Sequence, residues 1–172
     1  MKTIDTVAEL MDISARTAPK TKGEDYIVTK ILDQKDIQRL GDEMIKFGEK
    51  MNKPGFIRDG KNVKDSQALI LIGVKNHPPL GSDCGACGFT CNTIKIGEKS
   101  GNFLGPNCIK RIIDLGIALG SAVKTASIHN IDNRIMYRAG HIARKIGLID
   151  VNVVYAIPLS VSGKNIYFDR TQ

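Results

Sequence analysis

Four cysteines are the residues of this chain whose type and spacing are best suited to chemistry. They follow the pattern C-x2-C-x3-C, and sixteen residues then separate the third cysteine from the fourth. Three close-set thiolates on one loop can hold three corners of a cubane iron–sulfur cluster, and a more distant thiolate can close the fourth corner. The pattern therefore predicts one 4Fe–4S cluster in residues 82–110. The predicted ligands are Cys84, Cys87, Cys91 and Cys108.

The residues around the cysteines agree with an anionic cluster. Gly85 and Gly88 each follow a predicted ligand, where the absence of a side chain lets backbone N–H groups approach the sulfurs. Cys108 stands at the start of a long predicted helix, whose N-terminal dipole favours negative charge. Further positive charge lies nearby in the sequence, at Lys95, Lys99, Lys110 and Arg111.

Zinc and disulfides are the competing interpretations of the four cysteines. Structural zinc usually takes two C-x2-C-like pairs, and here the second pair is missing. A non-redox binding protein stabilised by zinc nevertheless stays open as an alternative. Disulfides are disfavoured because Asp5, Glu9 and Asp12 interrupt the apolar pattern of the N-terminus, which excludes a secretory signal and predicts a cytoplasmic protein.

Composition limits the partners of the chain. Its 172 residues suit a single domain, 1–172, and its net charge is +7. Aromatic residues make up only 5%, tryptophan is absent and the basic residues are dispersed, so we expect no nucleic-acid partner. The longest apolar run, Ala68–Val74, is too short to cross a bilayer, so we expect no membrane partner. An acidic redox partner protein would suit the positive charge.

Four further basic residues are candidates for binding an anion or the phosphate of a flavin. Arg16, Lys20 and Lys22 lie in or beside one loop at the end of a predicted helix. Arg134 lies near the start of another helix, where an ion pair would explain it equally well. A solvated basic loop is the alternative for the first three.

The periodicity of the chain predicts alternating helices and strands without strict βαβ order, which indicates an α+β fold. A T-x-x-E capping box at Thr6 opens the first helix, which ends near Pro19. Asp36 and Asp132 are predicted to open two later helices. The remaining predictions are strands at 26–32, 68–75 and 151–158, helices at 36–51, 109–127 and 133–146, and an edge strand or arm at 163–170.

The segment DCGACGFTCNTIKIGEKSGNFLGPNC resembles the cluster-binding segment of electron-transport subunits and corrinoid iron–sulfur proteins. Those proteins carry C-x2-C-x4-C, so this chain has one residue fewer before its third cysteine. Over nearly the whole chain, SARTAPKTKGEDY, DLGIALGSAV, DNRIMYRAG and GKNIYFDR resemble a prokaryotic family of uncharacterised proteins that contain a ferredoxin domain. This resemblance implies an iron–sulfur cluster and no assigned reaction.

A second resemblance, at the level of the fold, is to nitroreductases. Ala18-Pro19-Lys20, the strand and helix that follow, and the strand Ala68–Val74 come in the nitroreductase order, with residues 114–120 resembling the long central helix. The resemblance implies a homodimer built on that helix. An upstream S-x-R segment to hold a flavin phosphate is missing, so FMN is not favoured. We expect an iron–sulfur protein in electron transfer or redox chemistry, with an FMN-dependent oxidoreductase carrying an accessory cluster as the alternative.

Overall fold

The computed structural model describes residues 2–169, so Arg170, the last residue of the C-terminal segment quoted above, lies outside the described residues. The described part holds five α-helices and one short 3-10 turn. They are α1 (Lys2–Thr17), η1 (Thr21–Gly23), α2 (Gln34–Lys50), α3 (Pro54–Lys64), α4 (Ile109–Ile128) and α5 (Tyr137–Lys145). None of these helices is both long and apolar enough to span a membrane.

Within the described residues, six strands form two sheets. The main sheet is antiparallel throughout and has the order β1-β2-β6-β5, while β3 and β4 form a separate hairpin. β2 is central and fully buried, and its Ile70 pairs with Ile31 on one side and Ile157 on the other. The strands are β1 (Ile27–Ile31), β2 (Ala68–Val74), β3 (Lys99–Ser100), β4 (Leu104–Gly105), β5 (Asp132–Asn133) and β6 (Val153–Ser160).

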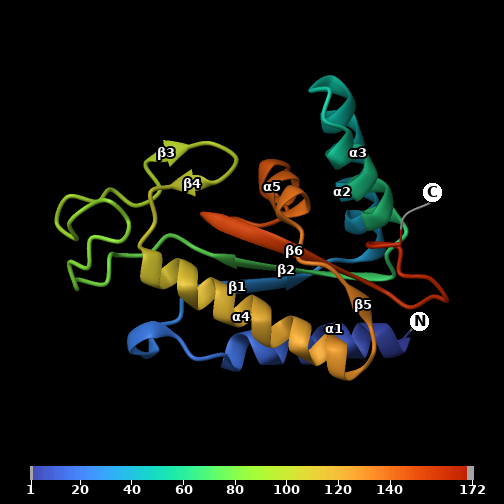
Figure 1. The fold of residues 1–172 in the computed structure, drawn as a ribbon, viewed down its shortest axis with the longest axis horizontal. Helices are drawn as coiled ribbons and strands as arrows, with labels where there is room; N and C mark the ends of the chain where they lie inside the picture. Colours follow the sequence, from blue (N-terminus) through green and yellow to red (C-terminus); the bar gives the residue numbers. More distant parts are fainter. Residues whose placement is uncertain (1, 170–172) are drawn as a thin grey trace.

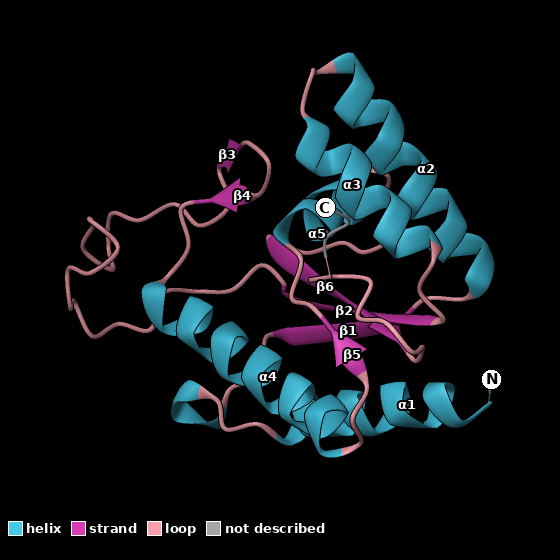
Figure 2. Cartoon of the chain, turned by 45° about the vertical axis from the view of Figure 1, so that its right-hand side comes forward, coloured by secondary structure: helices cyan, strands magenta, loops and turns pink. Residues whose placement is uncertain are grey.

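The main sheet is the middle layer of three. Helices α1 and α4 cover one face, and α2, α3 and α5 cover the other (Figures 1 and 2). Because side chains alternate along a strand, Ile70 and Ile72 of β2 pack toward α1 and α4, whereas Leu69 and Leu71 pack into the opposite core. This explains the unbroken apolar run of β2, and it confirms the α+β fold class.

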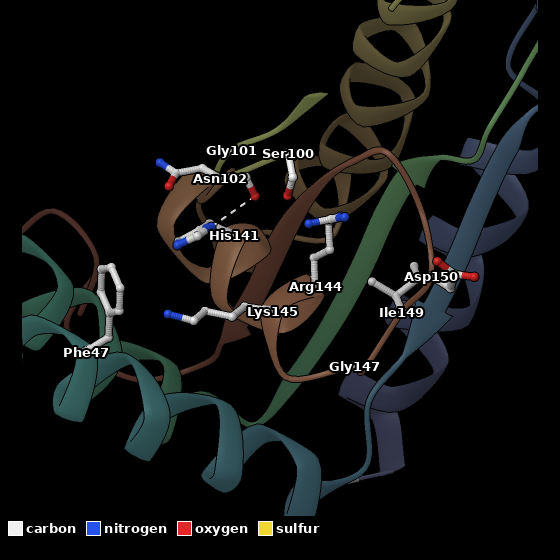
Figure 3. Close-up of a pocket in the computed structure, with 10 residues that line it drawn as sticks. All are labelled: Phe47, Ser100, Gly101, Asn102, His141, Arg144, Lys145, Gly147, Ile149 and Asp150. Carbon is white, nitrogen blue, oxygen red and sulfur yellow. Dashed lines mark hydrogen bonds between the residues drawn. The ribbon is translucent and has the colours of Figure 1, made fainter. Parts of the chain in front are cut away.

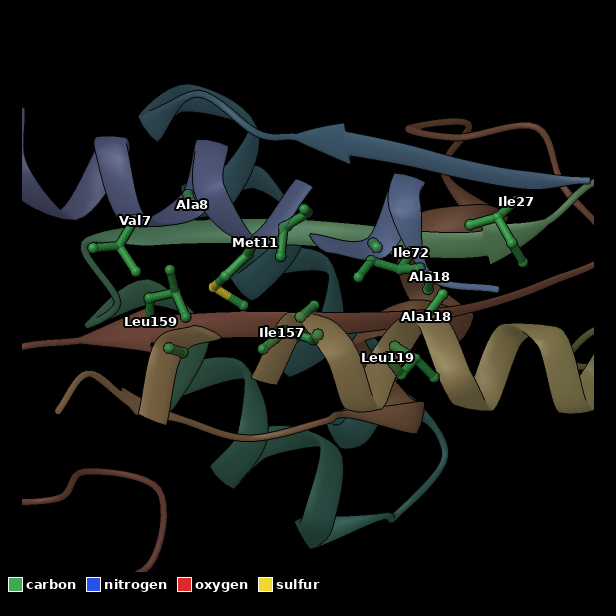
Figure 4. Packing of buried hydrophobic residues seen from close by; sticks show 14 of the residues in the cluster. Val7, Ala8, Met11, Ala18, Ile27, Ile72, Ala118, Leu119, Ile157 and Leu159 are labelled. Carbon is green, nitrogen blue, oxygen red and sulfur yellow. The ribbon is translucent and has the colours of Figure 1, made fainter. Parts of the chain in front are cut away.

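Helix α4 packs closely against α1 because it turns small side chains toward it. Ala118, Ala122 and Ala126 are fully buried, and they share one core with Ala8 and Met11 of α1. Figure 4 shows Ala8, Met11 and Ala118 in this core. Small residues let two helix backbones approach one another. The start of α4 is thereby fixed at one end of the sheet, where the cysteine segment joins it (Figure 1).

Three predicted helix starts are wrong. α1 begins at Lys2, so Thr6 lies inside the helix. α2 is capped by Asp33, whose side chain accepts a hydrogen bond from the backbone N–H of Asp36 at 2.7 Å. The predicted cap of α5, Asp132, belongs instead to β5, which extends the main sheet beside β6, and α5 starts only at Tyr137.

Helix α3 was not predicted. A proline just after the predicted helix 36–51 is typical of a helix end, but Pro54 occupies the first turn of a new helix, where its missing N–H costs nothing. The C-terminal segment is an arm and not an edge strand within the described residues. Its Tyr167 is buried and shares a hydrogen bond with Ser66, while Phe168 stays largely exposed.

Candidate metal centre

The cysteine segment connects β2 to α4 and projects beyond the end of the main sheet (Figure 1). It carries three cysteines on an irregular loop, then the β3–β4 hairpin, then Cys108 at the start of α4. All four thiols are free of disulfides. Cys84 is exposed, Cys87 and Cys91 are half-buried, and Cys108 is buried. The four predicted ligands therefore lie on one segment, and their burial increases from Cys84 at the surface to Cys108 in the core.

Two glycines shape the loop around the first two cysteines, each directly after one of them. Gly85 and Gly88 have φ angles of +69° and +82°, which residues with a side chain rarely adopt. The N–H of Gly88 donates to the carbonyl of Gly85 at 2.9 Å and closes a tight turn around Cys87. A Cβ atom at either glycine would meet no other atom within 4 Å. Conformation, and not crowding, is what requires glycine at both positions.

Backbone N–H groups already point at two of the four sulfurs. The N–H of Asp83 donates to Sγ of Cys91 at 3.4 Å. The pKa of Cys84 is lowered, chiefly by a backbone hydrogen bond from Ala86, with smaller contributions from Ser82 and the charge of Lys110. Donors and positive charge of this kind stabilise thiolates, which are the form that binds metal.

Cys108 occupies the N-cap position of α4 and has no side-chain capping bond. Its carbonyl oxygen accepts from the N–H groups of Arg111 and Ile112, at 3.0 and 3.2 Å, so the helix starts directly at this residue. The positive end of the helix dipole therefore lies beside its thiol, as the sequence predicted. The remaining free N–H groups of the first turn have the same effect on any negative charge placed there.

A polar network holds the residue before Cys108. Asn107 accepts at Oδ1 from the Asn152 amide at 3.1 Å, and its own amide donates to the Leu104 carbonyl at 2.7 Å. Nε2 of buried His77 lies 3.3 Å from the same Oδ1. Sequence reasoning missed this network, because its members come from the two ends of the segment and from the residue before β6.

The first turn of α4 is anchored by a second buried group. Arg111 is 1% exposed and donates to the Thr21 carbonyl at 3.0 Å, pairs with Glu24 and lies 4.6 Å from the ring of Tyr26. One turn later, Asp114 accepts from the N–H and hydroxyl of Thr21, at 2.9 and 2.8 Å. Arg111 was predicted to supply charge to a cluster; these contacts show that it ties α4 to the segment after α1.

The donor set fits an iron–sulfur cluster. It consists of four thiols, and soft thiolates are the ligands of such clusters. Within residues 2–169, no three His, Cys, Asp or Glu side chains converge on one metal position, so the structure does not bring the four cysteines together as a preformed ligand set. Sγ of Cys91 and Sγ of Cys84 each have a backbone N–H donor, as cluster sulfurs do, whereas Sγ of Cys87 donates to the carbonyl of Phe89 at 3.7 Å.

The basic residues predicted to bind an anion are engaged within the protein. Arg16 pairs with Asp25 at 2.6 Å, and Lys20 donates to the Ala15 carbonyl at 2.9 Å. Lys22 donates to the carbonyl of Leu80, just before the cysteine loop, at 3.1 Å.

Arg134 belongs to a different part of the fold. It lies 3.9 Å from Asp59 of α3, a buried carboxylate that Arg58 and Arg138 also bind, and 5.4 Å from the ring of Phe168. The structure does not gather Arg134 with the other three candidate residues, Arg16, Lys20 and Lys22.

Solved structures with a similar fold include a nitroreductase, an NADPH:FMN oxidoreductase and a BluB-like flavoprotein. Nitroreductase A of Vibrio parahaemolyticus matches 93% of this chain and 59% of its own, with a TM-score of 0.59 and 8% identity. The NADPH:FMN oxidoreductase of Vibrio harveyi matches 94% and 61%, with a TM-score of 0.58 and 9% identity. A BluB-like flavoprotein of Clostridium difficile matches 98% and 85%, with a TM-score of 0.58 and 12% identity. The chain thus spans about three fifths of the two Vibrio enzymes. These likenesses show a nitroreductase-like fold and nothing beyond it.

Similarity in sequence is much closer to one archaeal protein. An uncharacterized protein of Archaeoglobus fulgidus is 48% identical over 169 residues, which cover 97% of this chain and 91% of the relative. A family model described as "Uncharacterized protein containing a ferredoxin domain" matches residues 104–170, a range that includes Cys108. The chain belongs to this family of proteins containing a ferredoxin domain, as its sequence motifs predicted.

Proposed function

We propose that the chain binds one 4Fe–4S cluster through Cys84, Cys87, Cys91 and Cys108 and uses it to move single electrons. The observation that carries this proposal is the set of four free thiols, with an N–H donor already at Sγ of Cys91 and a helix N-terminus at Cys108. The family's ferredoxin domain supports the same chemistry. An oxidoreductase is the class of enzyme that such a cluster would serve.

The half-exposed loop suits electron exchange with another protein. Cys84 is exposed and Cys87 is half-buried, so a cluster held there has one side near the surface. The net charge of +7 favours an acidic redox partner, because opposite charges accelerate encounter.

The iron and sulfide content of the purified protein tests whether the cluster is present. Protein purified without oxygen should contain about four irons and four sulfides per chain, as four thiolate ligands to a cubane require. It should be brown and should bleach with dithionite. A colourless protein with one tightly held zinc would replace this proposal by the structural-zinc alternative.

A flavin-dependent oxidoreductase with an accessory cluster is the second candidate, because the solved structures of similar fold include FMN-dependent reductases. We expect no tightly bound FMN. Arg16, Lys20 and Lys22 already have partners and Arg134 lies apart from them, so these four residues form no cluster of free cations for the flavin phosphate. Titration of FMN into the reconstituted protein, followed by flavin fluorescence, decides between the two. Submicromolar binding that is lost in Arg16→Ala or Lys20→Ala would favour the flavoenzyme.

A further inference from the structure

A cavity of about 690 Å³ lies between α5 and the β3–β4 hairpin (Figure 3). Its walls are one face of α5, the hairpin turn at Ser100–Asn102, the loop at 147–150 and the ring of Phe47 from α2. The volume is in the range of sites that hold small metabolites. None of the residues proposed to bind the iron–sulfur cluster lines it.

Helix α5 turns three polar residues toward this cavity. His141, Arg144 and Lys145 are spaced i, i+3 and i+4, which places them on one helix face. Figure 3 shows all three side chains along the cavity wall, below the hairpin turn. One face of a short helix therefore presents an imidazole and two cations to the same space.

The two cations have no carboxylate partner among residues 2–169. Arg144 uses Nε to donate to the Val151 carbonyl at 2.9 Å, which fixes the side chain and leaves its terminal nitrogens unpaired. Nζ of Lys145 lies 4.6 Å from the centre of the Phe47 ring. Asp150 is the one acidic residue among the described lining residues, and it forms no ion pair there. The cavity thus carries an excess of positive charge.

His141 supplies an unpaired acceptor. The side chain is 6% exposed, and Nδ1 lies 3.0 Å from the carbonyl oxygen of Asn102. A carbonyl only accepts, so Nδ1 carries the hydrogen and Nε2 is the bare acceptor. Nε2 is buried and has no hydrogen-bond partner within the described residues. Buried polar atoms are nearly always paired, so Nε2 indicates a missing donor.

The hairpin joins the cavity to the cysteine segment. Asn102, which orients His141, stands in the turn of the hairpin between Cys91 and Cys108. Its amide also donates to the hydroxyl of Tyr137, and Phe103 packs edge-on against the same ring at 5.3 Å. A ligand that contacts this turn therefore contacts the segment that leads to Cys108.

We propose that the cavity binds a small organic anion, with its acid group between Arg144 and Lys145 and a hydroxyl or amine hydrogen donated to Nε2 of His141. The acid group is a carboxylate or a phosphate ester, because both accept from a guanidinium and an ammonium. The proposal goes beyond electron transfer, since it adds a small-molecule site next to the cluster-binding segment.

Calorimetric titration of the anaerobically purified protein with inorganic phosphate, glycerol 3-phosphate and malate tests the site. We expect one hydroxylated probe to bind more tightly than inorganic phosphate, and the identity of that probe separates a phosphate ester from a carboxylate. Lys145→Met keeps the apolar stem and should weaken binding by about tenfold, because a charge-assisted bond is lost. Lys124→Met, an exposed lysine of α4 outside the cavity, is the matched control and should change nothing.

NMR of nitrogen-15-labelled histidine tests the acceptor independently of any substitution. The chain has three histidines, so each ring is readily assigned. Binding should shift the Nε2 resonance of His141 and leave that of exposed His129 in place. Equal binding of all three probes with an unmoved His141 signal would overturn the role of His141. No binding of any probe, or equal loss in Lys145→Met and Lys124→Met, would overturn the site.

Discussion

Asp83 and Cys91 exchange two hydrogen bonds. The N–H of Asp83 donates to Sγ of Cys91 at 3.4 Å, and the N–H of Cys91 donates back to Oδ1 of Asp83 at 2.6 Å. Asp83 has a φ angle of +43°, a conformation that aspartate and asparagine adopt more readily than other residues with a side chain. One residue thus bends the chain, offers a donor to a predicted ligand and fixes the backbone of that ligand.

Two substitutions of Asp83 should distinguish the effect of its charge on the reduction potential from the effect of its hydrogen bond and backbone conformation on iron content. Asp83→Asn keeps an acceptor for Cys91 and tolerates the positive φ, so iron content should be unchanged. The loss of a negative charge beside an anionic cluster should raise the reduction potential by tens of millivolts. Asp83→Ala loses the acceptor and strains the turn, so iron content should fall. Spectroelectrochemistry and iron analysis measure both effects.

Glu49→Gln is the control for the charge effect, because Glu49 is an exposed carboxylate on α2, which packs on the other side of the sheet from α4. It should leave the potential unchanged. A potential in Asp83→Asn equal to that of the unaltered protein would show that no cluster lies beside this carboxylate.

Sequence patterns predicted the helices and strands that depend on residues close together in the chain. The run Ala68–Val74 gave a strand buried on both faces, and the periodicity of 109–127 gave α4 nearly to its ends. Helix α3 was missed because a proline can either end a helix or open one. At Pro54, only the packing of the following residues against α2 shows that a helix begins. The hairpin was missed because its strands have two residues each and Leu104 is held by the distant carbonyl of Asn152.

The candidate site likewise combines features that the sequence shows with contacts that only the folded structure shows. The spacing of the cysteines is visible in the sequence, and the four ligands stay a prediction. The reciprocal bonds of Asp83 and Cys91 depend on a backbone angle that no sequence pattern shows. His141 meets Asn102 across 39 positions, and such a contact arises only when the hairpin folds back onto α5.

Two cysteine variants should differ in how much stability they lose. Cys87→Ala and Cys108→Ala should both lose the cluster, because each removes a thiolate. In cluster-free protein, Cys108→Ala should cost about 1 kcal/mol more, since Cys108 is buried and Cys87 lies on the loop. Cys108→Ser should recover about 1 kcal/mol, because serine is a good N-cap residue and Cys108 makes no capping bond. Denaturant unfolding measures all three, and unchanged iron content in the alanine variants would show that these cysteines are not ligands.

Stability should fall as the pH drops from neutral. Burial is the main cause that lowers the pKa values of His77 and His141 in the folded protein. The unfolded chain therefore binds more protons once the pH falls through about 6.5, the ordinary histidine value, and unfolding is favoured. Melting temperatures across this range should fall less steeply for His141→Phe than for the unaltered protein. His129→Gln, at an exposed position, should leave the slope unchanged, and an equal slope in His141→Phe would contradict the account.

The long helix should mediate a homodimer. Ile113 and Ile117 are 48% and 39% exposed on α4, and a Cβ atom at Gly116 or Gly120 would meet nothing within 4 Å. An apolar stripe with small residues suits packing against a second copy of the same helix. Ile117→Glu should shift the protein to monomer in analytical ultracentrifugation, and Ile135→Glu, before α5, should not. A monomeric unaltered protein would contradict this expectation.

The central claim is that Cys84, Cys87, Cys91 and Cys108 hold one cubane cluster. Mössbauer spectroscopy of protein loaded with isotopically enriched iron tests it most directly, because it resolves the type of cluster and the fraction of iron within it. The account predicts that nearly all the iron belongs to one 4Fe–4S species, which takes up a single electron on reduction. A spectrum of isolated iron or of a two-iron cluster, or a protein that retains zinc and no iron, would contradict it.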